Sequence, residues 1–307
     1  MTSIVFPGQG SQYFGMCKEF YDNFKISQNL FNEIEEITSV PIKKIIFEDD
    51  TNNINLTKFT QICIFATSMS IFKVIEENID LKKLKIKIMF GHSLGEYTAL
   101  TAAKKISVKS AAELLKIRGE LMSNAISSNL SGMVALIGLN SSEVERIIVD
   151  NKLDIYIAND NSPQQIVIAG MLTNLNNSKE IFLKNGVKKF VQLNVSAAFH
   201  CPIMLETQQT MQKFIEKTNF IDNQISILSN FNAEISEDNI KIKNSLINQM
   251  ANKVKWRESI DSLSLTNDLK IVEVGPGKVL SGLIKRINNN FSVISINSIN
   301  DLKLLNK

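Results

Sequence analysis

The five residues Gly91-His92-Ser93-Leu94-Gly95 constrain the fold of this chain more than any other segment. They follow an apolar stretch, residues 85–90, and precede a run of small residues, 98–103. A G-x-S-x-G pattern between a strand and a helix is typical of a nucleophile elbow, where a serine lies on a strained turn. Both flanking positions need glycine, because side chains there would keep the strand and the helix apart. The pattern predicts Ser93 as a nucleophile in an α/β fold.

Apolar periodicity supports that fold class for most of the chain. Residues 3–6, 85–90 and 270–274 read as strands, and residues 59–77 have the spacing of a helix with one apolar face. Strands that alternate with helices predict a mostly parallel sheet covered by helices. We therefore expect an α/β protein with a hydrolase-like core.

The middle of the chain follows another pattern. Residues 133–195 read as β-α-β-β-α-β, the ferredoxin-like order. We therefore expect a ferredoxin-like α+β subdomain at residues 129–201, inserted in a large α/β hydrolase-like domain made of residues 1–128 and 202–307.

Composition excludes several classes of protein. A formal net charge of +3 with 21% charged residues does not indicate a nucleic-acid-binding protein or a disordered tail. The three cysteines, Cys17, Cys63 and Cys201, show no C-x-x-C spacing, which argues against a disulfide framework and fits a reducing compartment. The longest apolar run, near residues 62–72, is interrupted by Thr and Ser and is too short to span a bilayer. A cytoplasmic location is expected.

A nucleophilic serine needs a base, and the chain has only two histidines. His92 adjoins Ser93, so on a sharp turn its ring should point away from the serine hydroxyl. His200 follows a predicted strand, where active-site loops emerge. A hydrogen-bonded structural histidine is the alternative, but elimination favours His200 as the base. Cys201 is expected to be inert packing, because no second base remains to activate it.

Arg118 lies on the apolar stripe of a predicted helix, four residues after Leu114 and four before Met122. A charged group on an inward face needs a partner, because burying it unpaired is costly. One interpretation is an internal ion pair with a carboxylate such as Glu96, or a long stem reaching to solvent. The other is a planar fork that binds a substrate carboxylate. Spacing does not decide between them.

Two glycine turns resemble nucleotide-binding loops but lack the required residues. The turn Gly8-Gln9-Gly10 has Tyr13 where a dinucleotide fingerprint needs its third glycine. In Gly275-Pro276-Gly277-Lys278, Val279 replaces the Ser or Thr of a phosphate-binding loop. Either turn could be merely structural. The first could also supply a backbone N–H to an oxyanion hole.

At these residues the chain resembles the malonyl-CoA:acyl carrier protein transacylase family over its whole length. The motifs that carry the resemblance are Phe6-Pro7-Gly8-Gln9-Gly10-Ser11-Gln12, Gly91-His92-Ser93-Leu94-Gly95-Glu96-Tyr97, Arg118-Gly119, Asn161-Ser162-Pro163-Gln164-Gln165-Ile166-Val167, Phe199-His200 and Gly275-Pro276-Gly277-Lys278-Val279-Leu280. Several motifs in the family's order are more specific than any one of them.

The resemblance implies a ping-pong transfer. Ser93 would take the malonyl group from malonyl-CoA, and the phosphopantetheine thiol of acyl carrier protein would receive it, supplying fatty acid synthesis. The matching positions imply His200 as the base and Arg118 as the receptor of the malonyl carboxylate. An oxyanion hole would come from the backbone N–H groups of Gln9 and Leu94.

In this family a backbone carbonyl takes the place of a triad carboxylate. The matching carbonyl here is that of Gln249, so its side chain is expected to be replaceable at little cost. The family implies acyl carrier protein and a coenzyme A thioester as partners, with no permanent cofactor, metal, nucleic acid or membrane.

Three other functions fit part of the pattern. A serine hydrolase of the esterase or lipase type would share the elbow and the base, but would have no carboxylate for Arg118 to hold. A polyketide-type acyltransferase domain could carry another extender unit. A non-catalytic carrier-binding scaffold could have kept the fold, although intact Ser93 and His200 argue against it.

Overall fold

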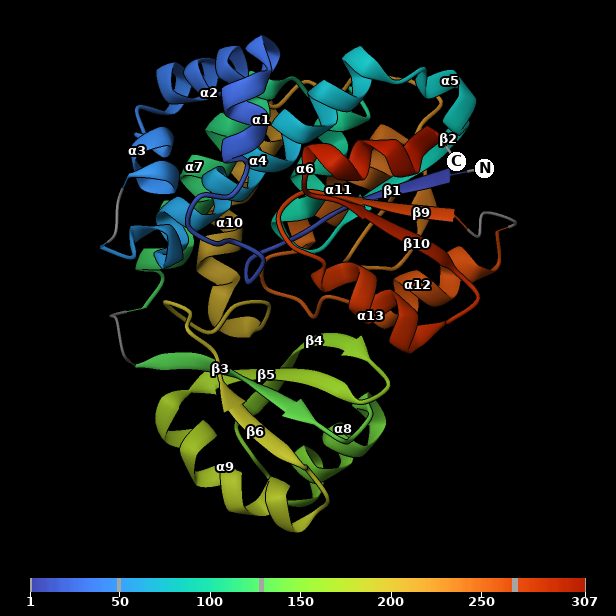
Figure 1. The fold of residues 1–307 in the computed structure, drawn as a ribbon. Coiled ribbons are helices and arrows are strands. Elements are labelled where there is room, and N and C mark those ends of the chain that lie inside the picture. The colour runs from blue at the N-terminus through green and yellow to red at the C-terminus, as the bar shows by residue number, and fades with distance from the viewer. Residues whose placement is uncertain (1, 49–50, 127–129, 267–269, 307) are drawn as a thin grey trace.

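The computed structural model describes residues 2–48, 51–126, 130–266 and 270–306, which contain two sheets. The strand order is β10-β9-β1-β2-β7-β8 in the larger sheet and β4-β5-β3-β6 in the smaller one (Figure 1). Every strand pair in the larger sheet is parallel except β7 with β8. The α/β class with a mostly parallel sheet is therefore confirmed.

The strands of the larger sheet are β1 (Thr2–Phe6), β2 (Ile86–Gly91), β7 (Ser226–Leu228), β8 (Ile235–Ser236), β9 (Lys270–Val274) and β10 (Ser292–Ile296). The helices around it are α1 (Lys18–Asn23), α2 (Lys25–Thr38), α3 (Ile42–Phe47), α4 (Thr57–Asn78), α5 (Leu81–Leu84), α6 (Leu94–Ala102), α7 (Val108–Asn124), α10 (Leu205–Lys217), α11 (Asn239–Asn248), α12 (Trp256–Ser264) and α13 (Val279–Ile287). Short 3-10 segments are η1 (Asn53–Asn55), η2 (Pro202–Met204) and η3 (Ile299–Asn306).

Alternation along the strands divides the interior into two cores. Ile4 and Phe6 of β1 belong to the core that includes residues of α4, α6 and α7. Val5, between them, belongs to the core under α12 and α13. Successive side chains of a strand point to opposite faces, so both faces of this sheet need covering helices. The sheet is thereby buried on both faces, so a site can form only at the ends of its strands.

Helix α4 runs through the middle of the first core. By length and composition it could cross a membrane, but 83% of its most apolar window is buried inside the protein. Phe72 of this helix meets Phe6 of β1 edge to face, with ring centroids 5.8 Å apart. Its apolar character is therefore explained by packing against the central strand.

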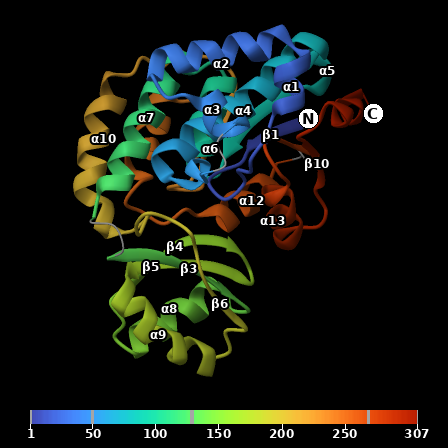
Figure 2. The ribbon, with the colours of Figure 1, turned by 60° about the vertical axis from the view of Figure 1, so that its left-hand side comes forward.

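The smaller sheet is antiparallel and comes from one continuous stretch. Its elements are β3 (Ser131–Ile137), α8 (Ser141–Asp150), β4 (Ile155–Ser162), β5 (Gln165–Met171), α9 (Leu172–Lys184) and β6 (Lys189–Gln192). Asn140 and Glu143 form a capping box that starts α8. Helices α8 and α9 cover the face of the sheet that is turned away from the larger part (Figure 2).

The other face of the smaller sheet is turned toward the larger part. Val134 and Leu136 of β3 pack in the core with residues of α8 and α9. The alternate residues, Met133 and Ala135, belong to the core of the larger part. We propose that this sheet and its helices form the inserted subdomain. Its expected first boundary, between residues 128 and 129, lies outside the described residues.

Candidate active site

Ser93 lies between β2 and α6 with a strained backbone, at φ 54° and ψ −108°. A Cβ atom on Gly95 would lie 2.2 Å from the carbonyl oxygen of Phe6, and one on Gly91 would lie 2.1 Å from the carbonyl of Gly95. Neither distance is possible, so both positions require glycine. A strained non-glycine residue persists only where its surroundings hold it.

Two side-chain amides hold the peptide groups of Ser93. The backbone N–H of Ser93 donates to Oδ1 of Asn230 (2.6 Å), and Nε2 of Gln249 donates to the carbonyl oxygen of Ser93 (3.0 Å). Asn230 also donates from Nδ2 to the carbonyl of Gly91 (2.7 Å). Sequence reasoning missed Asn230, which no local pattern marks. It reaches the elbow because it lies two residues past Leu228, which pairs in register with Phe90.

His200 bridges the serine and a backbone carbonyl. Its Nε2 lies 2.9 Å from Oγ of Ser93, and its Nδ1 lies 3.0 Å from the carbonyl oxygen of Gln249. A carbonyl can only accept, so Nδ1 carries the proton and Nε2 is free to accept one from the serine. Burial, helped by the charge of Arg118, lowers the pKa of His200 to about 3. The imidazole is therefore neutral near pH 7, as a base must be.

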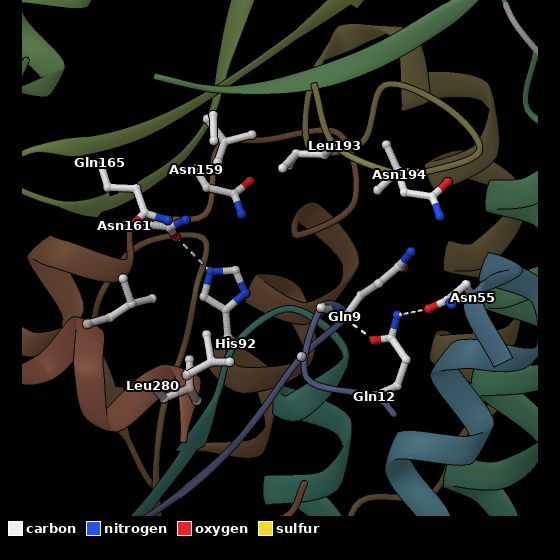
Figure 3. A pocket seen from close by; sticks show the side chains of 17 residues that line it. Gln9, Gln12, Asn55, His92, Asn159, Asn161, Gln165, Leu193, Asn194 and Leu280 are labelled. Atoms are coloured by element: carbon white, nitrogen blue, oxygen red, sulfur yellow. Dashed lines mark hydrogen bonds between the residues drawn. The ribbon is translucent and has the colours of Figure 1, made fainter. Parts of the chain in front are cut away.

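The neighbours of these two residues are turned to other contacts. Nε2 of His92 lies 2.9 Å from Oδ1 of Asn161 (Figure 3). The ring centroid of His92 lies 5.2 Å from that of Trp256. The His92 ring is thus hydrogen-bonded to Asn161 and not to Ser93. Burial raises the pKa of Cys201 to about 11, so its thiol stays protonated at neutral pH.

Arg118 is buried, with 1% of its surface exposed, and has neutral acceptors. Nη1 donates to Oε1 of Gln61 (2.6 Å), while Nη2 donates to Oε1 of Gln249 (2.9 Å) and to Oγ of Ser93 (3.0 Å). The ion pairs found within the described residues do not include one between Arg118 and Glu96. The internal ion pair and the solvent-reaching stem are therefore both wrong. Gln61 was missed, although a buried glutamine on an apolar helix was a detectable signal.

The turn after β1 packs directly on the elbow. A Cβ atom on Gly8 would lie 2.4 Å from the carbonyl oxygen of His92. Leu94 is the first residue of α6, where N–H groups have no acceptor within the helix. Gln9 and Leu94 line a small pocket of about 80 Å³ together with Ser93, Arg118 and His200. The structure thus brings the predicted nucleophile, base, carboxylate receptor and both oxyanion-hole residues together in one pocket.

A second pocket, of about 310 Å³, continues from the first, since both are lined by Gln9, His92, Asn159, Leu193 and Val195 (Figure 3). Its polar wall consists mainly of side-chain amides: Gln9, Gln12, Asn55, Asn159, Asn161, Gln165 and Asn194. Among the described residues, no Asp, Glu, Lys or Arg lines it. Such a wall suits a neutral chain that carries amide groups. Within the part of the chain that the structure describes, no group of three or more His, Cys, Asp or Glu is placed to hold a metal ion.

Glu96 lies behind the serine and is fully buried. Its Oε2 accepts from Nε2 of Gln249 (2.7 Å) and from the backbone N–H of Asn230 (3.2 Å). Burial raises the pKa of this carboxyl group to about 7, despite those hydrogen bonds. The carboxyl group therefore changes its charge close to neutral pH.

Glu96→Gln should change how stability depends on pH. The pKa of Glu96 is higher in the folded protein than in the unfolded chain, so its contribution to stability is greatest below about pH 4.5 and is lost as pH rises to about 7. Glutamine does not titrate. The free energy of unfolding of the variant should therefore gain about 2–3 kcal/mol relative to wild type between pH 5 and pH 8. Urea unfolding at several pH values measures this, and a constant difference would contradict the raised pKa.

Comparison with known families gives one match over nearly the whole chain. Residues 4–296 match the family described as "Acyl transferase domain". The chain is 31% identical over 305 residues to the malonyl CoA-acyl carrier protein transacylase of Bacillus subtilis (strain 168), covering 98% of this chain and 95% of the relative.

Solved structures of the same kind superpose closely. The acyl-carrier-protein-S-malonyltransferase of Bartonella henselae shares 34% identity at a TM-score of 0.93, covering 99% of this chain and 98% of that one. A malonyl-transacylase in complex with a type II PKS acyl-carrier protein shares 30% identity at a TM-score of 0.93, covering 100% and 99%.

Proposed function

This chain belongs to the acyl transferase domain family, and we propose that it transfers malonyl groups from malonyl-CoA to the phosphopantetheine thiol of acyl carrier protein. The transfer runs through a malonyl ester on Ser93 and supplies fatty acid synthesis. The observation that carries this proposal is Arg118, a buried guanidinium with neutral acceptors, 3.0 Å from the serine oxygen. A malonyl carboxylate would give it the opposite charge that none of the described residues supplies within hydrogen-bond distance.

The two half-reactions use the same groups in turn. His200 takes the proton of Ser93 as its oxygen attacks the thioester carbonyl, and the N–H groups of Gln9 and Leu94 stabilise the oxyanion. Collapse forms the serine ester and releases the thiol of coenzyme A, which takes the proton from His200. The carrier thiol then loses its proton to His200 and attacks the ester carbonyl. The bond to the serine oxygen breaks, the malonyl group stays on the carrier as a thioester, and the Ser93 oxygen takes the proton back from His200.

The amide-lined pocket explains how one site serves two partners. Coenzyme A and the prosthetic group of a carrier protein share a pantetheine arm, which is neutral and contains two amide bonds. The proposed channel for this arm is lined by amides such as Asn159, Asn161 and Gln165, with no charged side chain among the described residues of its wall. The protein needs no permanently bound cofactor for this chemistry. We place it in the cytoplasm, where malonyl-CoA and carrier proteins meet.

Arg118→Ala should narrow the preference for malonyl over acetyl groups. A charged hydrogen bond contributes about 1.5–3 kcal/mol, so malonyl transfer should fall roughly ten- to a hundred-fold. Acetyl transfer should change much less, because an acetyl group has no carboxylate to bind. Arg118→Lys should restore only part of the loss, since an ammonium group cannot form the planar fork. The measurement is kcat/KM for malonyl-CoA and acetyl-CoA. Equal losses for both substrates would assign Arg118 a structural role.

The proposed function itself is tested by weighing the protein. Wild type mixed with malonyl-CoA should gain one malonyl group, and adding holo acyl carrier protein should remove it and load the carrier. A serine hydrolase would instead release free malonate and cleave neutral esters. Failure of the carrier to accept the group, with rapid hydrolysis in its place, would overturn the proposal.

A further inference from the structure

The carboxyl group of Glu96 lies at the centre of the hydrogen bonds behind the nucleophile. Glu96 does not line the small pocket, and its direct bond to Ser93 is a backbone one, from its N–H to the Ser93 carbonyl oxygen (3.1 Å). One oxygen, Oε2, accepts from the side chain of Gln249 and from the main chain of Asn230. Those two residues hold the carbonyl and the N–H of Ser93. Both supports of the strained serine therefore converge on one carboxyl group.

The side chain of Gln249 also reaches Arg118. Its Nε2 donates to Glu96 and to the carbonyl of Ser93, and its Oε1 accepts from Nη2 of Arg118 (2.9 Å). These contacts argue against the expectation that this side chain is replaceable at little cost, and the variant described below tests it. Only the contact of Gln249 with His200 uses the backbone carbonyl.

The chemistry of the partners allows one orientation of the Gln249 amide. A guanidinium can only donate, and the Ser93 carbonyl can only accept. Glu96 strengthens this orientation, because an acceptor behind Nε2 favours the NH₂ group on that side. The opposite orientation would turn the NH₂ group toward Arg118, with two donors facing each other. Glu96 thus acts on Arg118 through the amide between them.

We propose that Glu96 is a positioning residue for substrate selection, which holds Arg118 in place for the malonyl carboxylate through the side chain of Gln249. Through Asn230 and Gln249 it also supports the backbone of Ser93. This inference rests on the proposed malonyl transfer and adds a residue that lies outside the small pocket and whose carboxyl group acts through Asn230 and Gln249. It predicts two separable effects: a loss common to all acyl groups through Ser93, and an additional loss for malonyl through Arg118.

Glu96→Leu and Glu96→Gln distinguish these two effects from a general loss of stability. Leucine fills much of the same volume but accepts no hydrogen bond. We expect it to lower kcat/KM about ten-fold for acetyl-CoA and about a hundred-fold for malonyl-CoA, as for the loss of hydrogen bonds to a charged group. Glutamine can place its carbonyl oxygen where Oε2 lies. It should therefore restore the ratio of the two substrates to within about three-fold of wild type, because neutral bonds are weaker but similarly directed.

A double-mutant cycle with Arg118→Ala tests the coupling directly. If Glu96 acts through the guanidinium, Glu96→Leu should not change the malonyl-to-acetyl ratio once Arg118 is absent. Glu273→Gln is a matched control. Glu273 is a buried carboxyl group that accepts from the N–H groups of Leu280 and Ser281, at another turn. Its substitution should lower stability and leave the ratio unchanged.

A second variant keeps the test valid if Glu96→Leu does not fold. Gln249→Met retains the backbone carbonyl that holds His200 but removes every polar contact of the side chain. It should lower the ratio to the same extent as Glu96→Leu. Equal losses for malonyl and acetyl groups in both variants would overturn the inference. That result differs from failure of the proposed function, in which wild type itself would form no malonyl ester or load no carrier.

Discussion

Ser93→Ala should abolish the acyl-enzyme and reduce transfer by a factor on the order of 10⁴ or more. The hydroxyl is the only group lost, and it lies 2.9 Å from the base and 3.0 Å from Arg118. The fold should survive, because the bonds that hold the elbow use the backbone of Ser93. Alanine meets the same strain at φ 54° as serine does. Intact-mass spectrometry after exposure to malonyl-CoA measures the adduct directly.

A matched control is Ser259→Ala, which removes another buried serine hydroxyl, bonded to the carbonyl of Lys255. That variant should form the adduct at the rate of wild type. A full malonyl adduct on the Ser93→Ala protein would place the nucleophile elsewhere. Peptide mapping would then identify it.

His200→Ala should slow both half-reactions, each by roughly 10²–10⁴-fold. One imidazole takes the proton from the serine in the first step and from the incoming thiol in the second. No other histidine can replace it, since His92 is bonded to Asn161. Rapid-quench measurement of ester formation, and separately of transfer from a preformed ester to a thiol, gives the two rates.

His92→Asn is the comparison for loss of the other histidine. It should cost much less, because the ring lines the pocket but is hydrogen-bonded to Asn161 and not to the serine hydroxyl. Suppose that His200→Ala slowed ester formation but left transfer to the thiol unchanged. A second base would then be needed for the carrier half-reaction, and the single-imidazole mechanism would be wrong.

Much of the fold could be predicted from local patterns. The elbow has a sequence signature, because only glycine fits at Gly91 and Gly95. The two glycines therefore indicate the backbone geometry directly. Alternating apolar residues indicated the strands, and the order of elements between residues 131 and 192 is the one predicted. The boundaries were predicted less closely: the pattern was expected over residues 133–195, whereas β3 begins at Ser131 and β6 ends at Gln192.

The site could be predicted only where a residue type is rare in the chain or where a charged residue lies on an apolar face. Two histidines made elimination possible, and Arg118 stood out as a charge on an apolar stripe. Asn230 and the side chain of Gln249 could not be found this way. They come from segments more than 130 residues away from Ser93, and Asn is abundant throughout this chain. Their role depends on which strand ends meet, which no local pattern encodes.

The connectivity of the two sheets has a consequence for the order in which the protein forms during translation. The smaller sheet is complete once β6 ends at Gln192, whereas the central strand β1 receives its neighbour β9 only from Lys270 onward. Nearly 80 residues separate these points, or roughly 4–16 s of synthesis at 5–20 residues per second. We therefore expect the smaller sheet with its helices to be folded in the nascent chain before β9 is available to pair with β1. On ribosomes stalled shortly before residue 270, the strands β4 and β5 that line the channel would be folded, but Ser93 would not yet be an active nucleophile.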